Sequence, residues 1–377
     1  MTDPRVERLA ELVVDYSLEL GEGQILRIDA VDVGAPLALN IYRAALAVGA
    51  HPYTNVTLEG IPELLLGEGS EEQLAYVSPL QWSEIETIDA LITIWSEANT
   101  RALTRVKPER QARHLAAQRK LSNRRWERIA SGEMRWCGTL FPTHAHAQEA
   151  EMSLEEYEDF VFSACHVDED DPAAHWRLVA ASLAARAEEL ESVRELRILG
   201  PDTDLRLGVD GRKWLAADGR YNMPDGEVFT SPVEGETEGE IRFTFPAVYH
   251  GREVTDVRLR FADGSVTAAE AARGDDYLQS LLAIDDGARV VGELAFGLNY
   301  EIDRWTRNIL FDEKIGGTLH IALGSAFPQA GGVNSSGLHW DMICDLRSEG
   351  EVYADGELIW RAGRFLTEPA TEVLEHR

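Results

Sequence analysis

The sequence predicts an α/β domain with a mostly parallel sheet, followed by a mainly antiparallel β domain of the α+β type. Three observations lead to this fold class. The chain has 377 residues, which is enough for about two domains of ordinary size. Its first half alternates helical and strand patterns, as βαβ crossovers do. Its second half alternates polar and apolar residues at period two, which is typical of antiparallel strands.

The first half begins with a predicted helix. Asp3 and Pro4 read as an N-cap followed by proline at the first helical position, and apolar residues then recur at helical spacing up to Leu20. The segment 90–95 is a continuous apolar run, as expected of a strand buried on both faces. The other predicted elements are strands at 24–28 and 53–58, helices at 36–48, 154–165 and 173–190, and an amphipathic stretch at 71–77.

The second half contains short strands separated by turn signals. Period-two alternation predicts strands at 196–199, 205–209 and 257–261, and a short helix is expected near 275–283. The turn signals are Asp210-Gly211, Asp218-Gly219 and Asp263-Gly264. The change of pattern places the domain boundary after residue 192, which gives an N-terminal domain at 1–192 and a C-terminal domain at 193–377.

Charge and cysteine content exclude several classes of protein. The chain has 36 Lys and Arg against 66 Asp and Glu, a formal net charge of −30, so nucleic acid and anionic lipid are poor partners. The three cysteines show no C-x-x-C spacing, which argues against a disulfide framework or a zinc ribbon. We find neither a signal peptide nor an apolar run of roughly 18 residues. We therefore expect a cytoplasmic protein with no membrane partner.

One histidine and one aspartate stand out as candidate metal ligands. In the segment SSGLHWDMICDLR, His339 and Asp341 alternate with apolar residues, so both project to the same face of a predicted strand. An imidazole and a carboxylate on one face are a plausible pair of ligands. Asp345 and Arg347 follow at the same parity and could form a charge pair.

Three more candidates lie in apolar strands. His320 in GGTLHIALG, Glu227 in NMPDGEVFTSP and Glu293 in ARVVGELAFG all have apolar neighbours. A charged or polar side chain there needs a partner, so a satisfied core histidine and ordinary salt bridges are the alternatives to metal binding. Together with His339 and Asp341 these residues exceed the needs of one zinc ion. Two divalent ions bridged by a carboxylate would use all five.

The remaining histidine pairs carry weaker signals. His144 and His146 form an H-x-H pair in FPTHAHAQ, which could bind a metal if it lay on a strand. His166 and His175 flank the acidic stretch VDEDD, which we interpret as a solvated loop.

The chain resembles the dinuclear-metal aminopeptidases of the aminopeptidase T and aminopeptidase S family. The resemblance extends over nearly the whole chain and is carried by RWCGTLFPTHAHAQ, YNMPDGEVFTSPVEGETEGEIRF, NILFDEKIGGTLHIALG and NSSGLHWDMICDLR. By motif, the metal ligands of the family fall on Glu227, Glu293, His320, His339 and Asp341. The resemblance also implies a homodimer and the release of N-terminal residues from peptides with a free N-terminus.

One position departs from the family pattern. The family commonly has a catalytic tyrosine seven residues after the histidine of H-I-A-L-G, and this chain has Phe327 there. If the missing hydroxyl stabilises the tetrahedral intermediate, its loss costs roughly 3–4 kcal/mol, or about 10²–10³ in rate. The possible substitutes are His144, His146, Lys314 and Arg347.

The expected reaction is hydrolysis by a water activated by two metal ions, which could be zinc, cobalt or manganese. In this hypothesis Glu227 is the bridging carboxylate, and Glu293 serves as ligand, general base or both. Two alternatives remain open. One is a ring-cleaving dioxygenase on the same scaffold, with one Fe(II) held by His320, His339 and Asp341. The other is a metal-binding protein with weak or lost peptidase activity.

Overall fold

The chain forms two compact units. The computed structural model describes residues 3–249 and 251–367. The first unit comprises residues 1–175 and 219–224, and the second comprises 176–218 and 225–377. These bounds differ from the domain limits drawn from the sequence, 1–192 and 193–377, which stay a prediction. Helix α9 (Pro172–Leu190) begins in the first unit and continues into the second.

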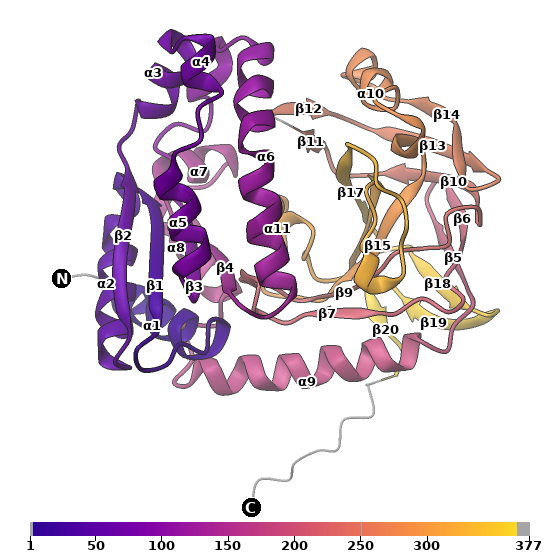
Figure 1. The fold of residues 1–377 in the computed structure, drawn as a ribbon. Coiled ribbons are helices and arrows are strands. Elements are labelled where there is room, and N and C mark those ends of the chain that lie inside the picture. Colours follow the sequence, from indigo (N-terminus) through magenta and orange to yellow (C-terminus); the bar gives the residue numbers. More distant parts are fainter. Residues whose placement is uncertain (1–2, 250, 368–377) are drawn as a thin grey trace, which may run out of the picture. The chain divides into compact units, whose positions relative to one another are not determined.

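The first unit contains a five-stranded parallel sheet (Figure 1). Its strand order is β2-β1-β3-β4-β8, and every neighbouring pair is parallel. The strands are β1 (Ile25–Val31), β2 (His51–Thr57), β3 (Ala90–Trp95), β4 (Arg135–Leu140) and β8 (Asn222–Met223). The apolar run at 90–95 forms the central strand β3. The predicted α/β domain is therefore confirmed.

Helices flank this sheet. Helix α2 packs on β1 and β2, while α5 and α6 cover the sheet face that carries Leu91 and Trp136. Asp3 caps the first helix by accepting a hydrogen bond from the Arg5 backbone N–H. The helices are α1 (Pro4–Leu12), α2 (Ala35–Ala47), α3 (Ile61–Glu68), α4 (Glu71–Leu74), α5 (Pro79–Thr87), α6 (Pro108–Ala130), α7 (His144–Glu149) and α8 (Leu154–Ala164).

The second unit contains two antiparallel sheets with a shared core. The smaller sheet has the order β17-β16-β15-β9-β7, and the larger has the order β14-β13-β10-β6-β5-β18-β19-β20. Leu294, Ile321 and Trp340 of the smaller sheet share one apolar cluster with Leu205 and Leu259 of the larger. The predicted antiparallel C-terminal domain is confirmed by this arrangement.

The strands of the smaller sheet are β7 (Leu215–Ala217), β9 (Glu227–Thr230), β15 (Val291–Gly297), β16 (Thr318–Gly324) and β17 (His339–Asp345). Those of the larger sheet are β5 (Glu195–Gly200), β6 (Thr203–Gly208), β10 (Thr237–Phe243), β13 (Val257–Ala262), β14 (Ser265–Glu270), β18 (Glu351–Ala354), β19 (Glu357–Arg361) and β20 (Arg364–Phe365). The unit also holds a hairpin of β11 (Ala247–Tyr249) and β12 (Arg252–Val254), and helices α10 (Asp275–Leu281) and α11 (Ile309–Asp312).

Two of the predicted turn signals join strands in different ways. Asp263 and Gly264 both have positive φ, at 50° and 77°, as a type I′ turn requires, and they join the paired strands β13 and β14. Asp218-Gly219 lies between β7 and β8, which do not pair with each other. Strand β8 instead pairs in parallel with β4 of the first unit.

None of the helices in the described part of the chain is both long enough and apolar enough to cross a bilayer.

Candidate metal centre

Strand register brings the predicted ligands to one face of the smaller sheet. They are Glu227, Glu293, His320, His339 and Asp341. Glu293 in β15 pairs with Ala322 in β16, which in turn pairs with Asp341 in β17. His320 and His339 each lie two residues from a member of this row, so they share its face. The period of two along each strand and the register between strands are the reasons that these residues meet.

Glu227 joins the same face from the next strand. It pairs with Gly297 of β15, four residues from Glu293, so its side chain has the same orientation. The other residues of this face include Gly297, Ala295 and Ala322, which carry little or no side chain, and the larger Phe229 and Ile343. The small residues leave space beside the oxygen and nitrogen donors.

The carboxylate of Glu293 lies between the two histidines. Its Oε1 is 3.6 Å from His320 Nε2, and its Oε2 is 3.3 Å from His339 Nε2. Asp341 Oδ1 is 3.6 Å from His339 Nε2, and Glu227 Oε2 is 3.9 Å from His320 Nε2. The structure thus brings together all five residues that the sequence singled out.

Backbone carbonyl groups orient both imidazole rings. His320 Nδ1 lies 2.9 Å from the Glu313 carbonyl oxygen, and His339 Nδ1 lies 2.9 Å from that of Ser325. Donation from Nδ1–H leaves each Nε2 facing the carboxylates. Metal-binding histidines are usually oriented by such a bond from the other ring nitrogen.

Burial and mutual pairing shift the pKa values of the cluster. Burial lowers the pKa of both histidines, but the neighbouring carboxylates, Glu293 among them, outweigh it and raise the pKa of His320 and of His339 to about 10. Burial also opposes ionisation of Glu293, yet hydrogen bonds from both rings bring the pKa of this residue to about 2. Without a metal the rings carry protons at neutral pH, and a metal must displace those protons to bind.

Two carboxylates have oxygens that the protein leaves unsatisfied. Glu227 Oε2 and Asp341 Oδ1 are buried and accept no hydrogen bond from the described residues. Burial raises the pKa of Glu227 well above its usual range and that of Asp341 to about 6. Buried oxygens of this kind need a cation or a proton. The donor set, two imidazole nitrogens and several carboxylates, therefore fits divalent metal ions.

Three further charged residues lie at the centre. Lys314 is fully buried, and its Nζ is 3.8 Å from Asp225 Oδ1 and 3.9 Å from Glu227 Oε1. It also pairs with Glu313, whose carboxylate lies close to His320 and Asp341. The carboxylates raise the pKa of Lys314 despite its burial. Asp225 and Glu313 were missed from the sequence because neither lies in an alternating strand.

Phe327 lies beside one of the predicted ligands. Its ring centroid is 5.6 Å from that of His339, at an interplanar angle of 88°, and 5.0 Å from that of Phe229. The Phe327 backbone N–H donates to Ser231 Oγ. A tyrosine at this position would therefore also have its ring beside His339, which agrees with the family resemblance.

The other sequence candidates have different partners. His144 and His146 lie on helix α7 and not on a strand, so positions two apart point in different directions. His146 instead lies 2.9 Å from Glu97. Arg347 pairs with Asp345 at 2.7 Å, which confirms the predicted charge pair.

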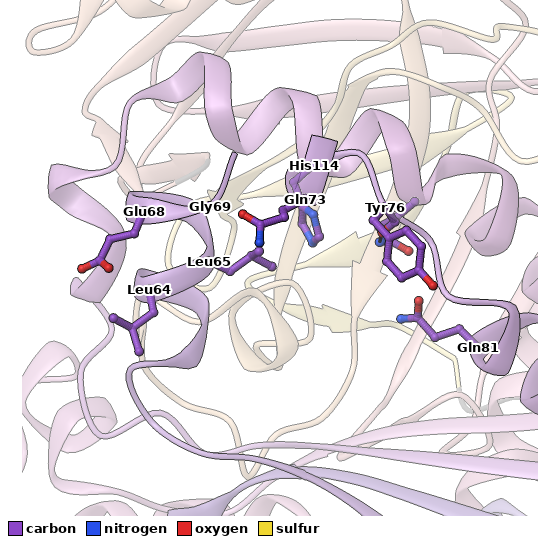
Figure 2. Close-up of a pocket in the computed structure, with 9 residues that line it drawn as sticks. Leu64, Leu65, Glu68, Gly69, Gln73, Tyr76, Gln81 and His114 are labelled. Atoms are coloured by element: carbon purple, nitrogen blue, oxygen red, sulfur yellow. Dashed lines mark hydrogen bonds between the residues drawn. The ribbon is translucent and has the colours of Figure 1, made fainter. Parts of the chain in front are cut away.

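The first unit holds a cavity of about 610 Å³ among helices α3 to α6 (Figure 2). The potential metal ligands among its lining residues are Glu68 and His114. His114 Nδ1 lies 3.0 Å from the Leu74 carbonyl oxygen. This lining offers no ligand set comparable to that of the metal centre.

Comparison with known proteins places the chain in a family. Residues 2–365 match the thermophilic metalloprotease family, M29. The chain is 29% identical to aminopeptidase 2 of Geobacillus stearothermophilus, over 98% of this chain and 99% of that protein. It is 28% identical to aminopeptidase T of Thermus thermophilus, over 86% and 85% of the two chains. The chain belongs to the M29 family of metalloproteases.

A solved structure supports the same conclusion. Wild-type AmpT from Thermus thermophilus matches with a TM-score of 0.86 at 25% identity, over 97% of this chain and 99% of that chain. The predicted fold class and the predicted class of enzyme, a metal-dependent aminopeptidase, are confirmed. The ring-cleaving dioxygenase is not supported.

Proposed function

We propose that the chain removes N-terminal residues from peptides at a dinuclear metal centre held by Glu227, Glu293, His320, His339 and Asp341. The position of Glu293 carries this proposal, because its two oxygens face one histidine each, at 3.6 and 3.3 Å. A carboxylate so placed can bridge two ions about 3.5–4 Å apart. Membership of a metalloprotease family supports the reaction class.

These distances favour Glu293 for the bridging role that the sequence analysis gave to Glu227. Of the two histidines, only His320 has a ring nitrogen near Glu227 Oε2, at 3.9 Å. Glu227 is therefore placed to bind a single ion. Asp341 lies near His339, at 3.6 Å. His320 and Glu227 would therefore hold one ion, His339 and Asp341 would hold the second, and Glu293 would be available to both.

The charge of the cluster supports two ions. The carboxylates at the centre are Asp225, Glu227, Glu293, Glu313 and Asp341. When all five are ionised, the ammonium of Lys314 leaves four negative charges. Two divalent cations balance that charge, whereas one leaves half of it buried and unpaired, which is costly.

The proposed reaction depends on the bound metal ions and on the side chains around them. When bound, the ions would polarise the scissile carbonyl and lower the pKa of a water molecule toward neutrality. Glu227 would hold one of these ions through Oε2, a buried oxygen that accepts no hydrogen bond from the described residues. The free amine of a peptide would bind a metal ion or an acidic side chain beside the ions, which suits an exopeptidase.

Phe327 leaves the developing oxyanion without a tyrosine hydroxyl. Lys314 is not a substitute, because its side chain is fully buried among carboxylates. Arg347 is held by Asp345. We therefore propose that the metal ions supply most of the oxyanion stabilisation and that turnover is slower than in relatives that keep the tyrosine.

Assembly, location and domain limits are also proposed. Family resemblance supports a homodimer, which light scattering after size-exclusion chromatography would measure. The three cysteines are buried and form no disulfide in the described part of the chain, which supports a reducing cytoplasm. We propose residues 193–377 as the catalytic domain, because all five proposed ligands lie there.

Metal titration tests the function directly. The protein is stripped with a chelator and titrated with zinc, cobalt or manganese, while hydrolysis of leucine p-nitroanilide and of dipeptides is followed. We expect activity to return as about two equivalents bind. The same dipeptides with acetylated N-termini should resist cleavage.

His339→Ala is the first variant, with His144→Ala as its matched control. His144 is an exposed histidine of the first unit, so its loss should leave metal content and activity unchanged. His339→Ala should lose one equivalent of metal and most activity. Full activity and metal content in His339→Ala would contradict the ligand assignment.

A further inference from the structure

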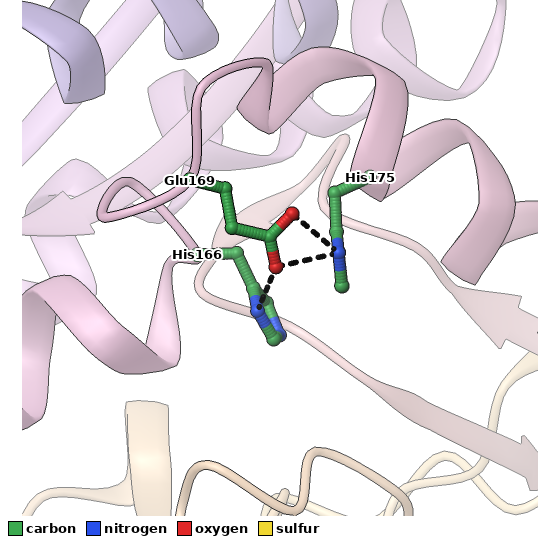
Figure 3. Close-up of side chains that lie close together, drawn as sticks. All are labelled: His166, Glu169 and His175. Atoms are coloured by element: carbon green, nitrogen blue, oxygen red, sulfur yellow. Dashed lines mark hydrogen bonds and ion pairs between the residues drawn. The ribbon is translucent and has the colours of Figure 1, made fainter.

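A second group of metal-binding side chains lies in the first unit, outside the proposed metal centre. His166, Glu169 and His175 come together between helices α8 and α9 (Figure 3). Glu169 Oε1 is 3.4 Å from His166 Nδ1 and 2.9 Å from His175 Nδ1. The two imidazole rings are stacked, with centroids 3.8 Å apart and an interplanar angle of 22°.

The backbone brings these residues together at a helix end. The His166 N–H donates to the Ser163 carbonyl and the Val167 N–H to that of Phe162, which is the hydrogen-bond pattern of a Schellman motif closing α8. His166 occupies the left-handed position of this motif, with φ of 55°, where glycine is usual. Residues other than glycine seldom adopt this conformation. It places the His166 ring against the ring of His175, which lies in the first turn of α9.

Two of the three donor spacings are close to those of a zinc site. Bond lengths to zinc of about 2.0–2.1 Å place neighbouring ligand atoms of a tetrahedral site roughly 3.3 Å apart. The distances here, 3.4 and 2.9 Å from Glu169 Oε1, lie on either side of that value. One ligand atom from each of the three residues lies within 4.8 Å of the other two, and a turn of the rings out of their stack would direct both nitrogen lone pairs at one ion and complete three coordination positions. Because Glu169 is exposed, water can take the fourth.

The two rings direct the same nitrogen toward one point. Both Nδ1 atoms face the same carboxylate oxygen of Glu169. With each Nδ1 deprotonated, the two nitrogens and this oxygen offer three lone pairs that a divalent cation can accept, and the cation also balances the charge of Glu169.

The surrounding charge also favours a cation. Asp168, Asp170 and Asp171 are exposed in the same loop. Arg5 reaches Asp168 at 3.9 Å, but it pairs more closely with other carboxylates. A local excess of negative charge raises the concentration of cations near the loop.

We propose that His166, Glu169 and His175 bind one Zn²⁺ ion, which joins the end of α8 to the start of α9. The ion has a structural role, because it closes a short loop between two helices, and it takes no part in peptide hydrolysis. This site is independent of the proposed dinuclear centre, whose ligands come from the smaller sheet of the second unit.

Zinc counting tests the proposal. The full-length holoenzyme, His175→Gln and Glu169→Gln are dialysed against buffered Zn²⁺, and bound zinc is measured by elemental mass spectrometry. Each variant should bind one equivalent less than the wild type and keep its peptidase activity. Glu169→Gln matters because its exposed side chain tolerates substitution even if His175→Gln fails to fold.

The control is His51→Gln, which removes an exposed histidine of β2 in the same unit. It should bind as much zinc as the wild type. Equal zinc content in Glu169→Gln and the wild type at every free zinc concentration would overturn the proposal. Because the readout is a difference between variants, it does not depend on how many ions the dinuclear centre holds.

Discussion

The two histidine–carboxylate clusters of this protein are built in different ways. At the proposed dinuclear centre, four paired strands contribute the ligands, and strand register fixes their common face. At the cluster of His166, Glu169 and His175, one helix end and one helix start meet across a short loop. The first arrangement is rigid and largely buried, and the second lies at the surface.

This difference predicts different functions for the two clusters. His320 is 1% exposed and Glu293 is 5% exposed, so their charges interact strongly and their pKa values move far from the usual range. The side chain of Glu169 is 46% exposed, so water screens its interactions. A buried, preorganised cluster suits catalysis, whereas an exposed one suits a structural ion.

The largest expected effect comes from removing the carboxylate of Glu293, which is proposed to bridge the two ions. Glu293→Gln should lower kcat by more than about 100-fold, beyond the 10–100-fold typical of groups that only orient a ligand. Glu169→Gln makes the same chemical change in the surface cluster and should leave kcat unchanged. Steady-state kinetics on leucine p-nitroanilide measures both. Equal kcat in the two variants would remove the functional distinction between the clusters.

Lys314 provides the second comparison. Lys314→Met should lower the free energy of unfolding of the metal-free protein by about 3–5 kcal/mol, because it leaves buried carboxylates without their cation. Lys213→Met changes an exposed lysine of the same unit and should cost less than about 0.5 kcal/mol. Urea unfolding measures both. A small effect at Lys314 would mean that the carboxylates around it are protonated.

The third comparison is between Phe327 and Phe229, and it concerns stabilisation of the oxyanion. Phe327→Tyr should raise kcat by about 10–100-fold, because a hydroxyl beside His339 can donate to the oxyanion. Phe229→Tyr adds a hydroxyl to the ring that packs against Phe327 and serves as the control, with no gain expected. If Phe327→Tyr gives no gain either, the ions alone stabilise the oxyanion.

The last comparison is between the metal-free and the metal-loaded protein, and it concerns the pH dependence of stability. In the metal-free protein the pKa of His320 and of His339 is about 10, above the ordinary value of 6.5. Their contribution to stability is therefore complete below pH 6.5 and disappears as the pH rises through 10. Burial raises the pKa of Asp341 to about 6, so the contribution of this residue to stability also decreases as the pH rises.

We expect the Tm of the metal-free protein to fall between pH 6.5 and 10, as measured by calorimetry. The zinc-saturated protein should lose less over this range, because the metal replaces the protons. Parallel Tm curves for the two forms would show that protons and metals do not compete for these histidines.

The sequence predicted the proposed ligands because period-two alternation and a charged residue in an apolar strand are local signals. It missed Asp225 and Glu313, because loops place these residues and no periodic pattern marks them. It also treated His166 and His175 as a solvated loop, because only the helix end at residue 166 turns one ring over the other. Strand β8 was missed because two residues are too few to show a pattern.

The most direct test is a crystal structure of the zinc-loaded protein with anomalous diffraction recorded on both sides of the zinc edge. We expect two peaks that flank the Glu293 carboxylate, one within bonding distance of His320 Nε2 and one within bonding distance of His339 Nε2. Bonding distances are about 2.0–2.1 Å. A single peak, or peaks that do not involve Glu293, would contradict the dinuclear centre.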